Sequence, residues 1–423
     1  MARDWDCVAF GFIEQEQVIA VIPKKGARFW LCPAFFLLAA APGFWLPVLA
    51  NVLHANGWGT YVTLTFMVLP LSAVLSPLIF SARADQVIAA EKLLAIIIAT
   101  GAILAGVAFL LLEQGERPML FILCLGLKSL VTAPAWPLLT TITLSTTDHP
   151  ERDFGKIRVW GTLGWMGAGW LVSLLAMDLS PTVGRLSVAA SLLGAACCFL
   201  LPHCPPKGGP PKNALDVLGL RAFRLFKQRD TAIFFGTAFL FSIPLAAYFM
   251  HTPQQLRFLG CEQIAAVMTV GQLTEVAAML LMAWFLRNWS IKAIFVLALG
   301  CGTLRYLLYA VGAAEDSLAC VLLGIALHGI CWTYFFEAGK VFLARRIEKA
   351  IRTQSQALLS LLTSGIGGLA GTAFVGWAHG YLVDETTGAG WSHYWWLLTA
   401  TCGLCVIGFM IGYRGNQTAR KDD

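Results

Sequence analysis

Residues 153–170 read DFGKIRVWGTLGWMGAGW, a run that would be typical of a membrane-spanning helix were it not for an arginine inside it. Arg158, Thr162 and Trp165 fall at positions i, i+4 and i+7, so they share one face of a helix. A charge at membrane depth is costly and normally faces a water-filled cavity or a partner. The segment therefore presents a cation, a hydroxyl and an aromatic ring together, as a site for a polar, ring-shaped solute requires.

The same segment is rich in glycine, and small residues let a neighbouring helix approach closely. The glycines are Gly161, Gly164, Gly167 and Gly169. A second interpretation of the arginine stays open from the residues alone. Arg158 follows Lys156 closely, so it can also mark the cytosolic end of the helix and extend its guanidinium toward the headgroups.

The composition excludes a soluble enzyme. The chain has 423 residues, of which 58% are hydrophobic and only 13% charged, as in a polytopic membrane protein. The net charge of +6 comes from basic residues dispersed among loops and does not indicate a nucleic-acid partner. No phosphate loop, nucleophile elbow or metal-ligand spacing occurs, and most of the twelve cysteines lie in apolar segments. We expect no enzymatic activity, no cofactor and no metal site.

Apolar stretches of about 20 residues are long enough to span a bilayer, and the chain contains twelve of them. They run over residues 29–53, 58–81, 92–112, 118–140, 156–177, 184–201, 231–251, 263–286, 292–312, 317–343, 354–379 and 391–413. With both termini inside, the cytosolic segments hold nearly all the basic loop residues, and the opposite side holds only Arg117, Arg185 and Arg257. This asymmetry predicts that both termini lie in the cytoplasm. We expect the membrane to be a bacterial inner membrane.

The longest internal polar segment divides the twelve spans six and six. Its first part is rich in proline, and its second part, LDVLGLRAFRLFKQR, predicts an amphipathic helix on the membrane surface. The predicted domains are a cytosolic tail (1–28), a six-helix bundle (29–201), a cytosolic linker with the amphipathic helix (202–230), a second six-helix bundle (231–413) and a cytosolic tail (414–423). Two six-helix halves indicate an all-α membrane protein of the major facilitator fold, with its site between the halves at mid-membrane depth.

Charged residues inside the spans are functional candidates, because burial there is expensive. Glu275 lies mid-helix with Gln272 one turn earlier on the same face. Arg305 on the next span lies at a similar depth, so it could pair with Glu275 and let that carboxylate load and release a proton. A static salt bridge between two helices is the alternative.

Three further candidates lie elsewhere in the spans. Glu337 and Lys340 stand at i and i+3 near a cytosolic end, where a mutual ion pair or a gate contact is expected. As the second acid within the C-terminal spans, Glu337 is also a candidate for proton coupling beside Glu275. Lys128 has no acidic partner in its own half, so it could reach Glu337 or an anionic solute group. Trp332, in an aromatic stretch, is either a solute contact or a core residue.

Several motifs together resemble the nucleoside:proton symporter family of the major facilitator superfamily. They are IRVWGTLGW (157–165), LRAFRLFKQRDTAIFF (220–235), VGQLTE (270–275), LRYLLYAVG (304–312) and RTQSQALLSLLTSGIGG (352–368). The resemblance implies solute contacts from Arg158, Thr162, Trp165, Gln272 and Glu275. The match is incomplete: Ala246 and Phe249 stand where the family has an amide pair, and Thr333 stands at the family's acidic position.

The sequence therefore predicts a monomeric proton symporter that imports a nucleoside, or a related ring-bearing polar solute, by alternating access. Its partners are the solute, protons and membrane lipid. Two alternatives stay open from the residues. The solute could be a sugar or an aromatic acid, since Lys128 and Arg158 would suit a carboxylate, or the chain could be a receptor that binds without transport.

Overall fold

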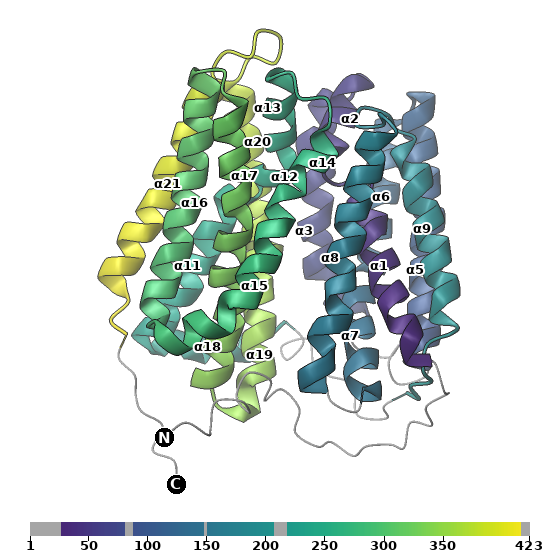
Figure 1. Ribbon diagram of the computed structural model, residues 1–423, viewed down its shortest axis with the longest axis vertical. Coiled ribbons are helices and arrows are strands. Elements are labelled where there is room, and N and C mark those ends of the chain that lie inside the picture. The colour runs from purple at the N-terminus through teal and green to yellow at the C-terminus, as the bar shows by residue number, and fades with distance from the viewer. Residues whose placement is uncertain (1–26, 81–87, 148–149, 207–217, 416–423) are drawn as a thin grey trace. The chain divides into compact units, whose positions relative to one another are not determined.

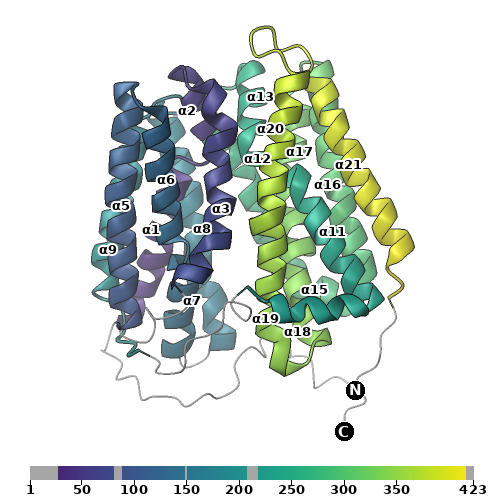
Figure 2. The same cartoon turned by 180° about the vertical axis from the view of Figure 1, so that it is seen from behind.

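The computed structural model describes residues 27–80, 88–147, 150–206 and 218–415. These residues form two compact units, Met1–Lys212 and Asn213–Asp423. The described part of each of the twelve predicted spans is mainly helical, as Figures 1 and 2 show from opposite sides.

The first unit contains six helical spans, two of them divided. Its helices are α1 (Leu31–Gly43), α2 (Leu49–Ala55), α3 (Val62–Phe80), α5 (Ala90–Gln114), α6 (Pro118–Thr132), α7 (Ala135–Thr146), α8 (Pro150–Leu174) and α9 (Val183–Cys198), with short 3-10 turns η1 (Ala27–Trp30) and η2 (Gly59–Tyr61). Pro134 separates α6 from α7, because proline lacks the N–H that would continue the helix.

The glycines of α8 bring this helix against α1. A Cβ placed on Gly164 would lie 2.9 Å from Phe36 Cα, closer than real Cβ atoms come to another heavy atom. A Cβ on Gly43 would in turn lie 3.1 Å from the backbone of Trp165. The predicted close approach of a neighbouring helix is therefore confirmed, and α1 is that neighbour.

The second unit contains the other six spans, several of them interrupted. Its elements are η3 (Leu220–Lys227), α11 (Arg229–Leu245), α12 (Ala247–Met250), α13 (Thr252–Phe258), α14 (Ile264–Met268), α15 (Val270–Asn288), α16 (Ile291–Ala314), α17 (Leu318–Trp332), η4 (Thr333–Glu337), α18 (Ala338–Arg346), α19 (Lys349–Ser360), η5 (Leu361–Gly367), α20 (Gly368–Leu382) and α21 (Trp391–Gly412). The elements η4 and η5 are π-helical turns. Such turns are rare and occur frequently at functional sites.

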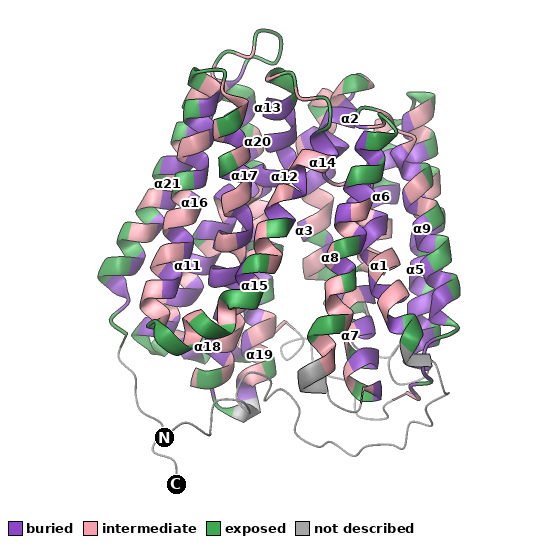
Figure 3. Cartoon of the chain, in the orientation of Figure 1, coloured by how far each residue is buried: buried purple, intermediate pink, exposed green. Residues whose placement is uncertain are grey.

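Apolar side chains cover both the inward and the outward faces of the long helices. On α21, Trp395 and Phe409 are fully buried, whereas Leu404 and Ile411 are at least 70% exposed, and Figure 3 shows both faces along this helix. A helix that is apolar all round is typical of a membrane span. Within the described ranges, nine helical segments are long and apolar enough to cross a membrane. The remaining predicted spans correspond to α1, α8 and α9, of which α1 and α9 are shorter and α8 carries charges in its first half.

Polar contacts fasten the chain where it leaves the spans. In the first unit the buried carboxylate of Glu91 accepts a hydrogen bond from the backbone N–H of Cys204 and lies 2.7 Å from His203 Nδ1. In the second unit Asp230 accepts the backbone N–H of Arg414 and pairs with Arg346. In each unit, an acidic residue in the first turn of a helix, α5 or α11, therefore binds a segment that is distant in the sequence.

The predicted amphipathic helix is shorter than expected. Residues 215–217 lie outside the described part, and the described remainder is the 3-10 helix η3. Its buried side chains are Ala222 and Leu225, whereas Phe223 is exposed. The tighter 3-10 helix therefore turns Ala222 and Leu225 inward and leaves Phe223 outside.

Candidate functional site

The three predicted solute residues of the first unit lie on one uninterrupted helix. Arg158, Thr162 and Trp165 of α8 are all half-buried. The Arg158 guanidinium lies 5.6 Å from the ring centroid of Trp136 on α7, a cation–π distance. The glycines of α8 fix the helix against α1, so these side chains stand on a rigid support.

Lys128 on α6 has an aromatic neighbour in its own unit. Its Nζ lies 5.0 Å from the ring centroid of Trp45. The ring face attracts a cation electrostatically, which lowers the cost of a half-buried ammonium. A contact of Lys128 with a solute or with Glu337 stays a prediction.

The two predicted solute residues of the second unit lie on α15, where this helix packs against α17. A Cβ placed on Gly329 of α17 would lie 2.5 Å from Glu275 Cα, so the two backbones touch. Gln272, one turn earlier, is only 7% exposed, and its Oε1 has no hydrogen-bond partner among the described residues. Buried amide oxygens are normally satisfied, so this atom is available to a ligand or a water molecule.

Arg305 pairs with a different residue from the one that the sequence suggests. Its Nη1 lies 2.9 Å from Nδ1 of His328, and its Nη2 donates to the Tyr306 hydroxyl at 2.7 Å. The contacts of Arg305 among the described residues include no ion pair with Glu275, and that pairing stays a prediction. The similar depths of Arg305 and Glu275 in the membrane do not say toward which helix the Arg305 side chain extends. Because α16 packs closely on α17 at Gly324, Arg305 extends toward α17.

Aromatic rings lie next to Arg305 and to its partner His328: the guanidinium carbon of Arg305 is 5.4 Å from the Tyr248 ring centroid and 4.5 Å from that of Tyr306. The Tyr248 ring stacks on His328 with centroids 3.8 Å apart and planes 2° from parallel, and Trp332 lies 6.1 Å beyond it. Sequence reasoning had identified Trp332 but had assigned no role to His328, Tyr248 or Tyr306. The available signal was the buried arginine itself, because a cation at membrane depth requires nearby acceptors.

Glu337 and Lys340 form the ion pair that their spacing predicts. Lys340 Nζ lies 2.7 Å from Glu337 Oε1, and Gln356 of α19 donates to the Lys340 carbonyl. Glu337 closes the π-helical turn η4, and Lys340 lies in α18. The pair therefore joins the turn to the helix that follows it, and a gate contact stays a prediction.

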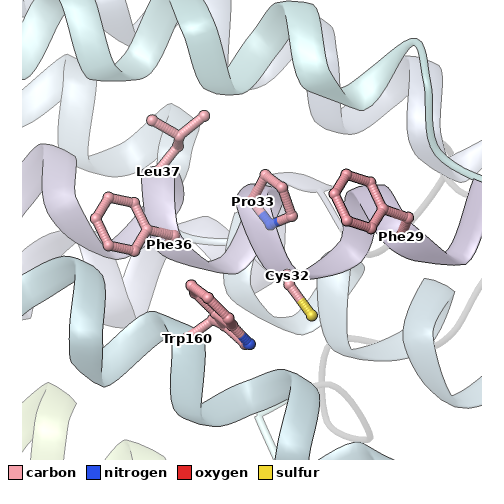
Figure 4. Close-up of a pocket in the computed structure, with 6 residues that line it drawn as sticks. All are labelled: Phe29, Cys32, Pro33, Phe36, Leu37 and Trp160. Carbon is pink, nitrogen blue, oxygen red and sulfur yellow. The ribbon is translucent and has the colours of Figure 1, made fainter.

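A separate pocket in the first unit contains none of the predicted site residues. It has a volume of about 460 Å³ and is lined by apolar side chains of η1, α1 and α8 (Figure 4). The lining residues are Phe29, Cys32, Pro33, Phe36, Leu37 and Trp160. Phe29 is 71% exposed and Trp160 43% exposed, so the pocket opens at the apolar surface rather than among polar groups.

A family model and the similar proteins of known name point to the same family. The model of the family described as Nucleoside H+ symporter matches residues 29–418. YegT of Escherichia coli K12, named as a candidate nucleoside transporter, is 30% identical over 371 residues, which cover 84% of this chain and 86% of that protein. Xanthosine permease of the same organism is 27% identical over 400 residues, covering 90% and 94% respectively.

A solved structure shows the same fold. A crystal structure of the nucleoside transporter NupG superimposes with a TM-score of 0.81 at 24% identity, covering 92% of this chain and 99% of that one. The likeness confirms the predicted all-α membrane protein of the major facilitator fold. The matched family is one of transporters, so the chain is not an enzyme.

Proposed function

Since the chain belongs to the Nucleoside H+ symporter family, we propose that it imports a nucleoside together with protons by alternating access. We place it in a bacterial inner membrane, as a monomer with both termini in the cytoplasm. In this proposal the bundles 29–201 and 231–413 are joined by a cytosolic linker at 202–230. The distribution of basic residues along the sequence supports this orientation.

The observation that carries the proposal is the buried amide oxygen of Gln272, which has no hydrogen-bond partner among the described residues. A buried polar atom without a partner costs about 1–3 kcal/mol, so a folded protein keeps one chiefly where a ligand or water completes it. Glu275 lies one turn away on the same helix, and its backbone packs against α17. An amide beside a carboxylate provides donors and acceptors suited to the hydroxyls and base edges of a nucleoside.

In the first unit, α8 supplies the other proposed contacts. The Arg158 guanidinium offers several donors in a planar fork, which matches carbonyl oxygens of a base. The Thr162 hydroxyl can donate or accept, and the Trp165 ring offers a face on which a planar base stacks. The departures at Ala246, Phe249 and Thr333 mean that the ribose is bound by other groups than the amide pair and acid of the family.

We assign proton coupling to Glu275. Arg305 is engaged with His328 and Tyr306, so coupling at Glu275 does not depend on a pair between this carboxylate and Arg305. Glu337 is already paired with Lys340, so we assign it to holding the helix end. Glu275 would then take up and release a proton as the transporter changes conformation, because the access of solute and solvent to this carboxylate changes with it.

Uptake into proteoliposomes tests the proposal. We expect labelled uridine, inosine or xanthosine to accumulate when the outside is made acidic, and a protonophore to abolish accumulation. Gln272→Met, which keeps the volume but removes the amide, should weaken uptake at least tenfold. Accumulation of sugars or aromatic acids but of no nucleoside would assign another solute. Solute binding without counterflow would indicate a receptor and contradict transport.

A further inference from the structure

The most unusual polar group of the second unit is a fully buried guanidinium with uncharged partners. Arg305 is 0% exposed, and its two terminal nitrogens meet the imidazole of His328 and the hydroxyl of Tyr306. The Tyr306 hydroxyl in turn hydrogen-bonds with the Pro244 carbonyl, and the Tyr306 ring lies 4.5 Å from the guanidinium carbon. The two terminal nitrogens are bonded, whereas the buried Nε has no hydrogen-bond partner among the described residues. The partners of the terminal nitrogens lower the cost of burying this charge.

The contact between Arg305 and His328 determines where the imidazole carries its proton. Arginine has five N–H donors and no acceptor, and it stays protonated in proteins. The His328 Nδ1 atom, 2.9 Å from Nη1 of Arg305, must therefore accept with its lone pair. A neutral imidazole has one N–H, so the proton lies on Nε2. Arg305 thereby holds His328 as a hydrogen-bond donor at Nε2.

His328 stands beside the residues that the proposed function assigns to the solute. A Cβ placed on Gly271 of α15 would lie 3.4 Å from His328 Cβ, and Gln272 is the next residue. Gly329, directly after His328, touches the backbone of Glu275. The hydrogen bonds of the described residues include none from His328 Nε2, so this donor is available.

The surroundings of the imidazole suit a planar ring. Tyr248 stacks on one side of His328, Trp332 lies 6.1 Å away, and the π-helical turn η4 begins directly after Trp332. Aromatic side chains provide flat apolar faces for a nucleobase, while one fixed polar group sets its orientation. A ribose, with hydroxyls that both donate and accept, would gain less from a donor of fixed position.

We propose that Arg305 is a positioning residue for solute selection: it fixes His328 as the Nε2–H tautomer, and His328 donates a hydrogen bond to a carbonyl oxygen or ring nitrogen of the nucleobase. This inference rests on the proposed function, because it requires a nucleoside as the solute. It assigns the buried arginine to specificity, separately from the proton coupling at Glu275.

Nitrogen NMR of the full-length protein labelled with 15N-histidine tests the first part. The His328 signals are identified by their loss in His328→Gln. In the parent we expect a pyridine-type Nδ1 and a pyrrole-type Nε2. Arg305→Met should shift His328 to a mixture of tautomers, whereas Tyr306→Phe, which leaves the Arg305–His328 contact in place, should not. A pyrrole-type Nδ1 in the parent would overturn the inference, even if Arg305→Met fails to fold.

Binding of nucleosides that each lack one base acceptor tests the second part. Deaza analogues replace a ring nitrogen by C–H, and deoxo analogues lack one carbonyl oxygen. One analogue should bind the parent at least tenfold more weakly than its nucleoside, since a site built around a hydrogen bond rejects a solute without it. In His328→Phe this difference should fall below twofold, and His328→Gln, which restores an N–H donor, should recover part of it.

The outcomes separate the two claims. Equal losses for every analogue in the parent and in His328→Phe would overturn the solute contact while nucleoside transport stands. If no nucleoside binds the parent, the proposed function fails and the solute contact fails with it. The tautomer measurement then still decides whether Arg305 fixes the imidazole.

Discussion

Replacing Gly164 by alanine should damage both stability and transport, because α8 has no room for a Cβ there. The new atom would overlap the Phe36 carbonyl and lie 2.9 Å from Phe36 Cα. Ordinary van der Waals contacts are 3.4 Å or longer, so α8 and α1 must separate by on the order of 1 Å. The obstacle is backbone, which cannot rotate out of the way as a side chain could.

Overpacking of this kind costs about 1–3 kcal/mol. For a unit of this size, that corresponds to a melting temperature lower by roughly 2–12 °C. The same displacement moves Arg158 relative to its surroundings, and an error of about 1 Å in a positioned group can cost on the order of a hundredfold in rate. We therefore expect nucleoside uptake by Gly164→Ala to fall at least tenfold.

Gly155→Ala is the matched control on the same helix. Gly155 is exposed, and a Cβ placed there meets no atom within 4 Å. Alanine is favoured over glycine in a helix by about 0.5–1 kcal/mol, so this variant should melt at the same temperature or slightly higher. Thermal unfolding in detergent and uptake into proteoliposomes are measured for both. Equal melting temperatures and equal uptake for the two variants would refute the packing of α8 on α1.

Three further predictions address the site and the topology. Arg158→Ala should abolish nucleoside binding, and Arg158→Lys should leave binding impaired, since a point charge lacks the planar fork of donors. If calorimetry gave near-normal nucleoside affinity for Arg158→Ala, Arg158 would be a residue that anchors the helix at the lipid headgroups. Glu337→Gln should keep proton-driven uptake, because Glu337 is already paired with Lys340, and loss of pH dependence in uptake assays would move proton coupling there. A cysteine introduced at Gly208 should be labelled by impermeant maleimide only from the cytoplasmic side, and exclusive labelling from outside would reverse the topology.

The positions of the spans could be predicted because bilayer thickness sets a length that the sequence must meet. The close packing at Gly164 could also be predicted from the sequence, because glycines in a membrane helix typically mark the face on which a neighbouring helix packs. The ion pair of Glu337 and Lys340 followed from the i, i+3 spacing alone, which needs no knowledge of neighbouring helices.

The partner of Arg305 could not be predicted in the same way. Depth along a helix follows from residue counting, but the direction of a side chain depends on which helices pack together. The stack of Tyr248 on His328 joins residues 80 positions apart in the chain, on α12 and α17. The π-helical turn η4 contains no proline, so its sequence carries no breaker signal. These features arise from tertiary packing.

The central claim is that Glu275 couples nucleoside movement to protons, and Glu275→Gln tests it most directly. Glutamine keeps the shape and hydrogen-bonding capacity of the side chain but cannot ionise. Proteoliposomes with this variant should exchange labelled nucleoside for unlabelled nucleoside while failing to accumulate it under an imposed proton gradient. Accumulation at the parental level, with the parental pH dependence, would contradict the account and place proton coupling at another residue.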